Sequence, residues 1–267
     1  MTPEGTVNRA ALPAIFNPED MNALEQALYI KDQNPGSEVL LLTMGPFRAA
    51  DIIREGLFRG ADGGVLLTDR KFAGADTLAT SYALSQAVKK INPDIILAGR
   101  QAIDGDTAQV GPQVAEKLGI PQVTYAEEIQ EISDTKVVVK RRLERGVEVV
   151  SCTLPCLVTV HATAAPCRPR HAKQVMKYKY ARTVTEDAAE GANYLLSLAD
   201  YPYLKITEWG TADVGGEDSS YGMAGSPTKV KKVENIVFQA KEAKKLTSSD
   251  EDIDSLISEL LANHTIG

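Results

Sequence analysis

The sequence predicts an α/β protein in which helices cover both faces of a mostly parallel, doubly wound sheet. Two observations support this fold class. Several short segments are apolar almost throughout, and from about residue 17 to residue 122 they alternate with longer amphipathic segments. A central parallel strand is apolar on both faces, and two parallel neighbours need a crossover helix between them. The pattern therefore favours a doubly wound α/β core, whose ligands bind at the carboxyl ends of the strands.

The first predicted helix begins at Asn17 and ends near Gln33. Asn17 suits the N-cap position, Pro18 suits the first helical position, and two acidic residues follow in the first turn. The apolar segment 38–43 is the first predicted strand. The later predicted elements are, in order, helix 49–59, strand 64–68, helix 76–90, strand 94–98 and helix 107–118.

The pattern changes after a strand at 122–125. Segments 136–142 and 147–153 mix polar and apolar residues around a turn at 144–146, which predicts a small antiparallel hairpin, and segment 156–161 predicts one more strand. Beyond about residue 165 only one regular element is predicted, a helix capped by Ser249 with an apolar stripe. We therefore expect a nucleotide-binding core over residues 1–190 and an extended C-terminal arm over residues 191–267. The arm is expected to dock on another subunit, and the alternative is that it folds back on its own core.

Composition excludes several classes of function. The chain has 267 residues and a net charge of −7, so it lacks the overall positive field that would favour nucleic acid. Its apolar runs are far shorter than a membrane-spanning helix, and its first residues do not resemble a signal peptide. Three cysteines and three histidines show no metal-binding spacing. We expect a cytoplasmic protein without a metal site or membrane insertion.

Three segments are expected at the carboxyl ends of the strands: residues 17–20, 43–46 and 99–110. The third is the most informative, because Gly105 can adopt positive φ and Asp106 or Thr107 can cap the following helix. Free amides at that helix start favour a phosphate or pyrophosphate. Asp104 and Asp106 then become candidates for hydrogen bonds to ribose or adenine. Taken singly, each segment could also be only a capped turn.

No motif for catalysis is present. The sequence lacks the G-x-G-x-x-G, G-x-x-x-x-G-K-[ST] and G-x-S-x-G patterns, and none of its histidines is near residues 99–110. The residues alone therefore indicate an adenine-nucleotide-type ligand, with no catalytic residue.

Residues 101–112, together with the preceding segment 95–100, closely resemble the β subunit of electron transfer flavoproteins. The resemblance extends from about residue 5 to residue 235 and includes segments 17–20, 44–46, 59–62, 75–77 and 225–230. It implies a Rossmann-like core and a heterodimer with an α subunit, which carries a mobile flavin-binding domain. The C-terminal arm of this chain would embrace that α subunit. The resemblance and the segments above together indicate a set of cofactor-binding residues. These are Asn17, Pro18, Glu19, Asp20, Met44, Thr77, Thr80, Gly99, Arg100, Gln101, Ala102, Ile103, Asp104, Gly105, Asp106, Thr107, Ala108, Gln109 and Val110.

The family resemblance leaves two cofactors for this site. Some members hold AMP as a structural ligand and others hold a second FAD. Segment 107–112 resembles the FAD-binding, electron-bifurcating branch, in which hydroxyls equivalent to those of Thr77 and Thr80 face the flavin. That branch implies electron flow from NADH to the α-subunit FAD and to a low-potential acceptor such as ferredoxin. It also implies an acyl-CoA dehydrogenase-type partner, in one case joined in an NADH-dependent enoyl-CoA reductase complex. The alternative is an AMP-holding scaffold that docks acyl-CoA dehydrogenases, and a weaker third hypothesis is an ATP-using ligase or hydrolase.

Two segments depart from the family pattern. Family members usually begin with an apolar strand and a Lys-x-Val-Pro-Asp-like loop, so we expect that the sequence starts after a central strand of the sheet. In the segment that the family uses for docking dehydrogenases, Arg168, Val175, Met176 and Lys177 can be aligned, but Ala172 stands where a larger apolar residue is expected. The alternative for this second segment is a solvated basic loop.

Overall fold

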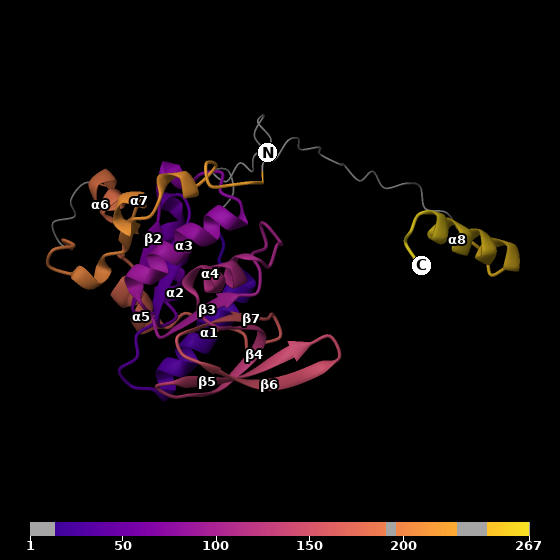
Figure 1. Ribbon diagram of the computed structural model, residues 1–267, viewed down its shortest axis with the longest axis horizontal. Helices are drawn as coiled ribbons and strands as arrows, with labels where there is room; N and C mark the ends of the chain where they lie inside the picture. The colour runs from indigo at the N-terminus through magenta and orange to yellow at the C-terminus, as the bar shows by residue number, and fades with distance from the viewer. Residues whose placement is uncertain (1–13, 191–195, 229–244, 267) are drawn as a thin grey trace. The chain divides into compact units, whose positions relative to one another are not determined.

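The computed structural model describes residues 14–190, 196–228 and 245–266 (Figure 1). Residues 1–229 form one compact unit and residues 230–267 form another. The first half of the larger unit follows the predicted alternation of helices and strands. Its elements are α1 (Pro18–Gln33), β1 (Leu40–Met44), α2 (Ala50–Leu57), β2 (Gly63–Leu67), α3 (Thr77–Ile91), β3 (Ile95–Gly99), α4 (Val110–Leu118), β4 (Gln122–Ile132), β5 (Lys136–Leu143), β6 (Gly146–Thr153) and β7 (Cys156–Val160).

The strands form two sheets, where the sequence predicted one. A three-stranded parallel sheet has the order β1-β2-β8, with β8 spanning Thr207–Trp209. A five-stranded sheet has the order β3-β7-β4-β5-β6, in which β3, β7 and the start of β4 are parallel and the rest is antiparallel. The predicted α/β fold is confirmed, but its sheet is divided between β1 and β3, which do not pair with each other. The predicted hairpin at 136–153 is confirmed, and its two strands pair in register from Lys136↔Thr153 to Leu143↔Gly146.

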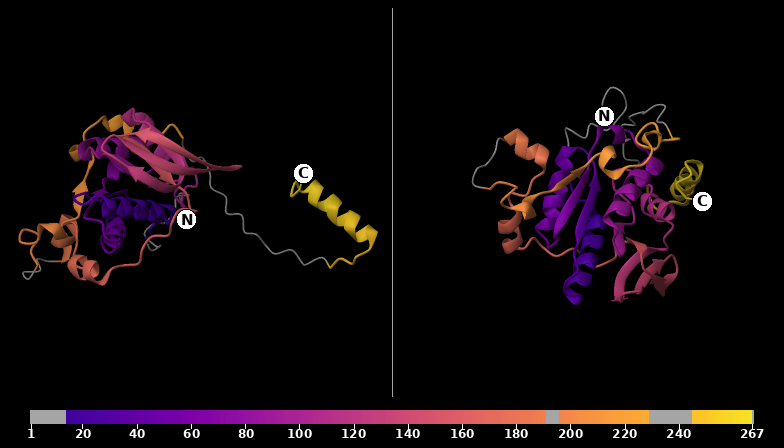
Figure 2. Two further views of the ribbon diagram at one scale, coloured as in Figure 1. Left: turned by 90° about the horizontal axis from the view of Figure 1, so that it is seen from below. Right: turned by 60° about the vertical axis from the view of Figure 1, so that its left-hand side comes forward.

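Helices cover both faces of these sheets, as the doubly wound prediction requires (Figures 1 and 2). Successive residues of a strand point to opposite faces. In β2, Leu66 packs in a cluster with α1 and α2, whereas Leu67 packs in a cluster with α3. In β7, Leu157 packs against α4, whereas Val158 packs in a cluster that includes α1. Helices α1 and α2 therefore lie on one face, and α3 and α4 on the other.

Helix α1 packs against both sheets. Its residues Ala23 and Ile30 belong to the core of the five-stranded sheet, and Leu24 and Leu28 belong to the core beside β2. The N-terminal end of α1 lies beside the carboxyl end of β3, where the candidate ligand loop begins. The packing of α1 thus determines where residues 17–20 meet residues 99–103.

The region after residue 165 has more structure than the sequence indicated. It contains the short helices α5 (Ala172–Tyr178), α6 (Val184–Glu190) and α7 (Thr211–Val214), and β8, which pairs with β2. Each of these elements is too short for a periodic pattern to show. The segment beyond residue 190 therefore contributes one strand to the core, and the larger compact unit extends to residue 229.

Helix α8 (Asp250–Ala262) belongs to the smaller unit. Ser249 caps it as predicted, because its side chain accepts a hydrogen bond from the Asp252 amide. The apolar side chains Ile253, Leu256, Ile257 and Leu261 are all more than a third exposed. Within the described ranges, no helix has the length and apolar character needed to cross a membrane.

Candidate nucleotide-binding site

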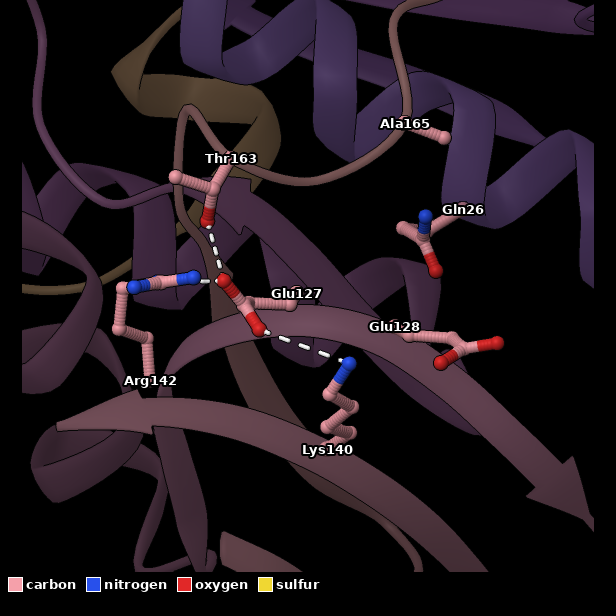
Figure 3. A pocket seen from close by; sticks show the side chains of 7 residues that line it. All are labelled: Gln26, Glu127, Glu128, Lys140, Arg142, Thr163 and Ala165. Carbon is pink, nitrogen blue, oxygen red and sulfur yellow. Dashed lines mark hydrogen bonds and ion pairs between the residues drawn. The ribbon is translucent and has the colours of Figure 1, made fainter. Parts of the chain in front are cut away.

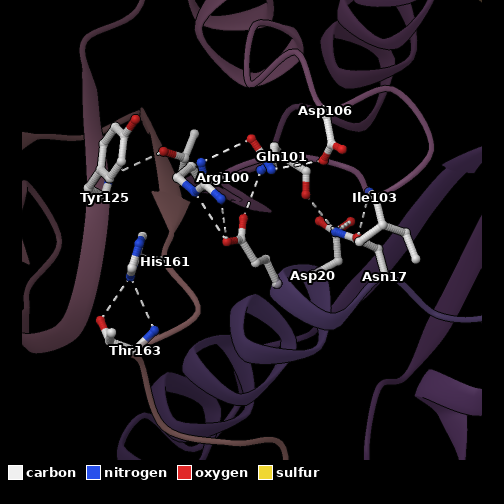
Figure 4. A network of polar contacts seen from close by, with 11 residues as sticks. Asn17, Asp20, Arg100, Gln101, Ile103, Asp106, Tyr125, His161 and Thr163 are labelled. Atoms are coloured by element: carbon white, nitrogen blue, oxygen red, sulfur yellow. Dashed lines mark hydrogen bonds and ion pairs between the residues drawn. The ribbon is translucent and has the colours of Figure 1, made fainter. Parts of the chain in front are cut away.

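Two acidic side chains at the start of α1 hold the loop that follows β3. The Asp20 carboxylate accepts a hydrogen bond from the Gly99 amide at 2.6 Å, and the Glu19 carboxylate accepts one from the Gln101 amide at 2.9 Å. The Arg100 guanidinium donates to Glu19 Oε1 at 2.9 and 3.1 Å. These contacts bring together segments that lie about eighty residues apart in sequence (Figure 4).

Asn17 completes this junction, but not as the cap that the sequence predicted. Its side chain makes no capping bond to α1. Its amide nitrogen instead donates to the Gln101 carbonyl and to Asp20, each at 2.9 Å, and its amide oxygen accepts from the Ile103 amide at 3.1 Å. Asn17 therefore binds the loop across the interface, and the amide groups of residues 99, 101 and 103 are all held by α1.

Burial affects the charge at this junction. Burial raises the pKa of Asp20 above its ordinary value, and the hydrogen bonds from Gly99 and Asn17 oppose only part of that shift. Gly99 allows the close approach, because a Cβ at this position would lie 2.7 Å from the Asp20 nitrogen. A side chain at residue 99 would therefore separate the loop from α1.

The second half of the loop adopts a conformation that the sequence did not predict. Gly105 does not have positive φ, whereas Asp106 (φ 49°) and Ala108 (φ 52°) do. Left-handed conformations cost a residue with a Cβ about 1–2 kcal/mol, and such strain is concentrated at functional sites. Two left-handed residues so close together give the loop an irregular backbone directly before α4.

Helix α4 begins three residues later than predicted, at Val110. Residues 106–109 stay outside the helix because Asp106 and Ala108 are left-handed. Neither Asp106 nor Thr107 caps the helix, and Gln109, which occupies the N-cap position, provides no side-chain cap. The Asp106 carboxylate instead accepts from the Gln101 side chain at 2.9 Å. The first amides of α4 thus keep no side-chain acceptor at the N-cap and can bind a phosphate.

The N-terminus of α3 meets this end of α4. Thr77 Oγ1 donates to Gln109 Oε1 at 3.1 Å, and Gln113 Nε2 donates to Thr77 Oγ1 at 3.4 Å. Gln113 Oε1 is buried and, within the described residues, has no hydrogen-bond partner. A buried acceptor without a partner calls for a specific explanation, and an ordered water or a ligand group is one. Sequence reasoning missed Gln113, although its position one helical turn after Gln109 places both side chains on one face of α4.

For the other predicted site residues, the structure gives the position in the fold and the burial. Met44 ends β1 and packs against the cluster around Leu67. Thr80 is half-buried, one turn after Thr77 in α3. Residues 102–107 are exposed. Their contacts with a ligand remain predictions.

Tyr125 and His161 are two further residues that the sequence did not indicate. Tyr125 has φ 60° where the pairing of β4 shifts register, and its ring is 39% exposed. The ring stacks on His161 with centroids 5.8 Å apart, and the Arg100 guanidinium lies 5.7 Å from the Tyr125 centroid (Figure 4). All three residues lie near the carboxyl ends of neighbouring parallel strands, beside the candidate loop.

A separate polar pocket of about 410 Å³ lies beside β4 and β5 (Figure 3). Its Glu127 carboxylate accepts a hydrogen bond from Thr163 at 2.7 Å and forms ion pairs with Arg142 and Lys140. These partners hold the pKa of Glu127 below its ordinary value. The charges that line this pocket therefore neutralise one another. Among the residues described, no cluster of histidine, cysteine or acidic side chains suits a metal ion.

The predicted docking residues divide into two groups. The Arg168 guanidinium binds Glu25 and Asp32 of α1 at 2.9 Å each, so it holds the segment onto the core. Val175, Met176 and Lys177 lie on the short helix α5, and Met176 is 65% exposed. Of the four predicted docking residues, Met176 and Lys177 are exposed, whereas Val175 is half-buried.

The comparisons with known proteins identify the family of this chain. The family model described as electron transfer flavoprotein domain matches residues 4–190, which include the whole 99–110 loop and its contacts with α1. The chain belongs to the electron transfer flavoprotein β-subunit family. It is a small subunit of an electron-transferring flavoprotein, and the resemblance seen in the sequence is confirmed.

Three relatives show the range of electron transfer flavoprotein subunits that this chain resembles. The caffeyl-CoA reductase-Etf complex subunit CarD of Acetobacterium woodii is 41% identical, covering 98% of this chain and 92% of its own length. The acryloyl-CoA reductase electron transfer subunit gamma of Anaerotignum propionicum is 40% identical, covering 100% and 93%. The electron transfer flavoprotein subunit beta of Megasphaera elsdenii is 44% identical, covering 85% and 78%.

Proposed function

We propose that this subunit binds FAD at the 99–110 loop and takes part in electron bifurcation from NADH. One electron would go to the α-subunit FAD and an acyl-CoA dehydrogenase-type acceptor, and the other to a low-potential acceptor such as ferredoxin. The α subunit and the dehydrogenase are the proposed protein partners. The names of the caffeyl-CoA and acryloyl-CoA reductase relatives support a role in such a complex.

One observation favours FAD over AMP: polar groups flank the uncapped end of α4 on two sides. On the α1 side are Asn17 and Gln101, and on the α3 side are Thr77 and Gln113. A phosphate at the end of α4 would lie between these groups. AMP has a nucleoside on only one side of its phosphate, whereas FAD carries groups on both sides of its diphosphate. A dinucleotide could therefore give Gln113 Oε1 the donor that it lacks.

The chain's own residues would bind and orient the cofactor. The first amides of α4 would bind the diphosphate, and α1 holds the loop through Glu19 and Asp20. Thr77 and Gln113 would bind polar groups on the other side. A bound flavin would supply the redox chemistry, since the protein's part is position and potential. This division explains why the site needs no catalytic acid or base.

The alternative function is an AMP-holding subunit that scaffolds the α-subunit flavin. The loop and the α1 contacts suit AMP equally well, because they concern one phosphate and one nucleoside. AMP would leave the α3 side unfilled, including the buried carbonyl of Gln113. We therefore keep AMP as the second candidate.

A titration of the nucleotide-free complex with FAD and with AMP tests this proposal. Gln113→Ala should weaken FAD binding roughly tenfold, the value of one lost buried hydrogen bond, and leave AMP binding unchanged. Gln122→Ala, an exposed glutamine at the start of β4, is the matched control and should change neither affinity. Equal affinities of wild type and Gln113→Ala for FAD would contradict the proposed position of the flavin half.

A further inference from the structure

Residues far apart in the sequence meet at the start of α3. Asp76 Oδ1 caps the helix by accepting from the amides of Leu78 and Ala79 at 3.0 and 3.1 Å. Its Oδ2 accepts from the Thr228 amide at 3.0 Å. The Asp76 amide in turn donates to Ser226 Oγ at 2.8 Å. We refer to Asp76, Ser226 and Thr228 as the Asp76 cluster.

The segment that carries Ser226 and Thr228 is tightly packed on the core. Tyr221 is 2% exposed, and its ring contacts Phe72 and Tyr82 edge-on. A Cβ on Gly222 would collide with the carbonyl of Lys71. Ser226 is 5% exposed, and its hydroxyl donates to the Gly222 carbonyl at 2.7 Å. The segment therefore packs closely on the core beside α3.

Charge strengthens the cluster. Burial raises the pKa of Asp76, but hydrogen bonds from the amides of Ala79, Thr228 and Leu78 outweigh it, and the pKa ends below its ordinary value. Hydrogen bonds to an ionised carboxylate are stronger than those between neutral groups. Asp76 is thus ionised at neutral pH while it holds both the helix and the distant segment.

The residue that follows Asp76 belongs to the candidate site. Thr77 is the first residue of α3, and its hydroxyl contacts Gln109 and Gln113. A displacement of the α3 terminus would move this hydroxyl relative to the end of α4. The contacts of Asp76 therefore control the distance between the two helix termini.

We propose that Asp76 is a positioning residue that couples the nucleotide site to segment 221–228. It holds Thr77 in place through the α3 cap and is itself held by Ser226 and Thr228. Nucleotide binding and immobilisation of segment 221–228 then stabilise each other, because coupling between two sites is reciprocal. The inference rests on the proposed function only in that a nucleotide binds the 99–110 loop, whether it is FAD or AMP.

Two variants separate the cap of α3 from the contact with the distant segment. Asp76→Ser keeps a good N-cap residue but removes the acceptor for the Thr228 amide. Ser226→Ala removes the other contact and leaves the cap intact. The matched control is Asp69→Ser, because Asp69 likewise accepts from a nearby amide, that of Lys71, and from a distant residue, Thr211, without contacting Thr77.

The experiment measures the affinity of the full chain, in its purified complex, for FAD and for AMP. Asp76→Ser should weaken binding of the resident nucleotide roughly tenfold and Ser226→Ala roughly fivefold, whereas Asp69→Ser should stay within about twofold. Hydrogen exchange of amides 221–226 should slow on nucleotide binding in the wild type and not in Asp76→Ser.

Unchanged affinity in both cluster variants, or an equal loss in Asp69→Ser, would overturn the proposal. If Asp76→Ser does not fold, Ser226→Ala decides by the same criterion. The proposed function can fail separately: if the complex binds AMP and not FAD, the effect of the variants on AMP affinity still tests the role of Asp76.

Discussion

Gly99 is the residue at which the candidate site depends most directly on backbone approach. Its amide donates to Asp20, and a Cβ would lie 2.7 Å from the Asp20 nitrogen and 2.8 Å from the Glu19 carbonyl carbon. Because these are backbone atoms, they cannot move aside as a flexible side chain would. The contact between α1 and the loop therefore allows no larger residue here.

We expect Gly99→Ala to lower the free energy of unfolding by about 1–3 kcal/mol, as overpacking does, and to weaken nucleotide binding. Chemical denaturation and nucleotide titration measure the two effects. Gly105→Ala is the control for the unfolding measurement alone, since a Cβ there meets nothing within 4 Å. Equal stability of the two variants would show that the close approach of residue 99 to α1 is not needed.

At the scale of elements, an ion pair joins α2 to α6. Arg54 donates to both carboxylate oxygens of Glu186 at 2.9 and 3.1 Å, and Glu186 also accepts from the Thr183 amide. Burial raises the pKa of Glu186, but these hydrogen bonds outweigh it and hold the pKa below 4.5. The ionised form of Glu186 therefore stabilises the fold.

The ionised Glu186 side chain should contribute its full stabilisation at pH values above the pKa that its carboxyl has in the unfolded chain. This contribution should be lost as the pH falls through the lower pKa of the same carboxyl in the folded protein. Glu186→Gln should therefore lower the free energy of unfolding by about 1 kcal/mol at pH 7 and by much less near about pH 3. Urea unfolding at a series of pH values measures this. A difference that is independent of pH would mean that charge plays no part in the contact.

At the scale of the whole molecule, α5 presents the free part of the proposed docking segment. Met176 is 65% exposed, and a large exposed apolar side chain suits insertion into a partner's pocket. Met176→Ala should weaken binding to an acyl-CoA dehydrogenase-type partner roughly tenfold without changing stability. Met223, 66% exposed in another segment, provides the control. Equal binding of Met176→Ala and wild type, measured by calorimetry, would exclude this role.

The sequence predicted the local elements well and the long-range contacts poorly. Apolar runs such as β2 and β7, and the Ser249 cap of α8, carry their pattern in neighbouring residues. The division into two sheets and the pairing of β8 with β2 depend on tertiary packing, which local patterns do not encode.

In the candidate site, too, local features were predicted and long-range contacts were not. The 99–110 loop and residues 17–20 were predicted, and the structure brings them together. Asp106 and Ala108 adopt the left-handed conformation, and Gly105 does not. Glycine has the stronger intrinsic preference for this conformation, but the surroundings of a residue can override that preference. Gln113 and the Asp76 cluster could not be predicted, since their roles depend on partners in other segments.

The central claim is that this subunit's own site holds FAD. The most direct measurement is acid release of the nucleotides from the purified heterodimer, followed by chromatographic separation and counting. The account predicts two FAD per heterodimer, one from each subunit, and no AMP. One FAD and one AMP per heterodimer would contradict it.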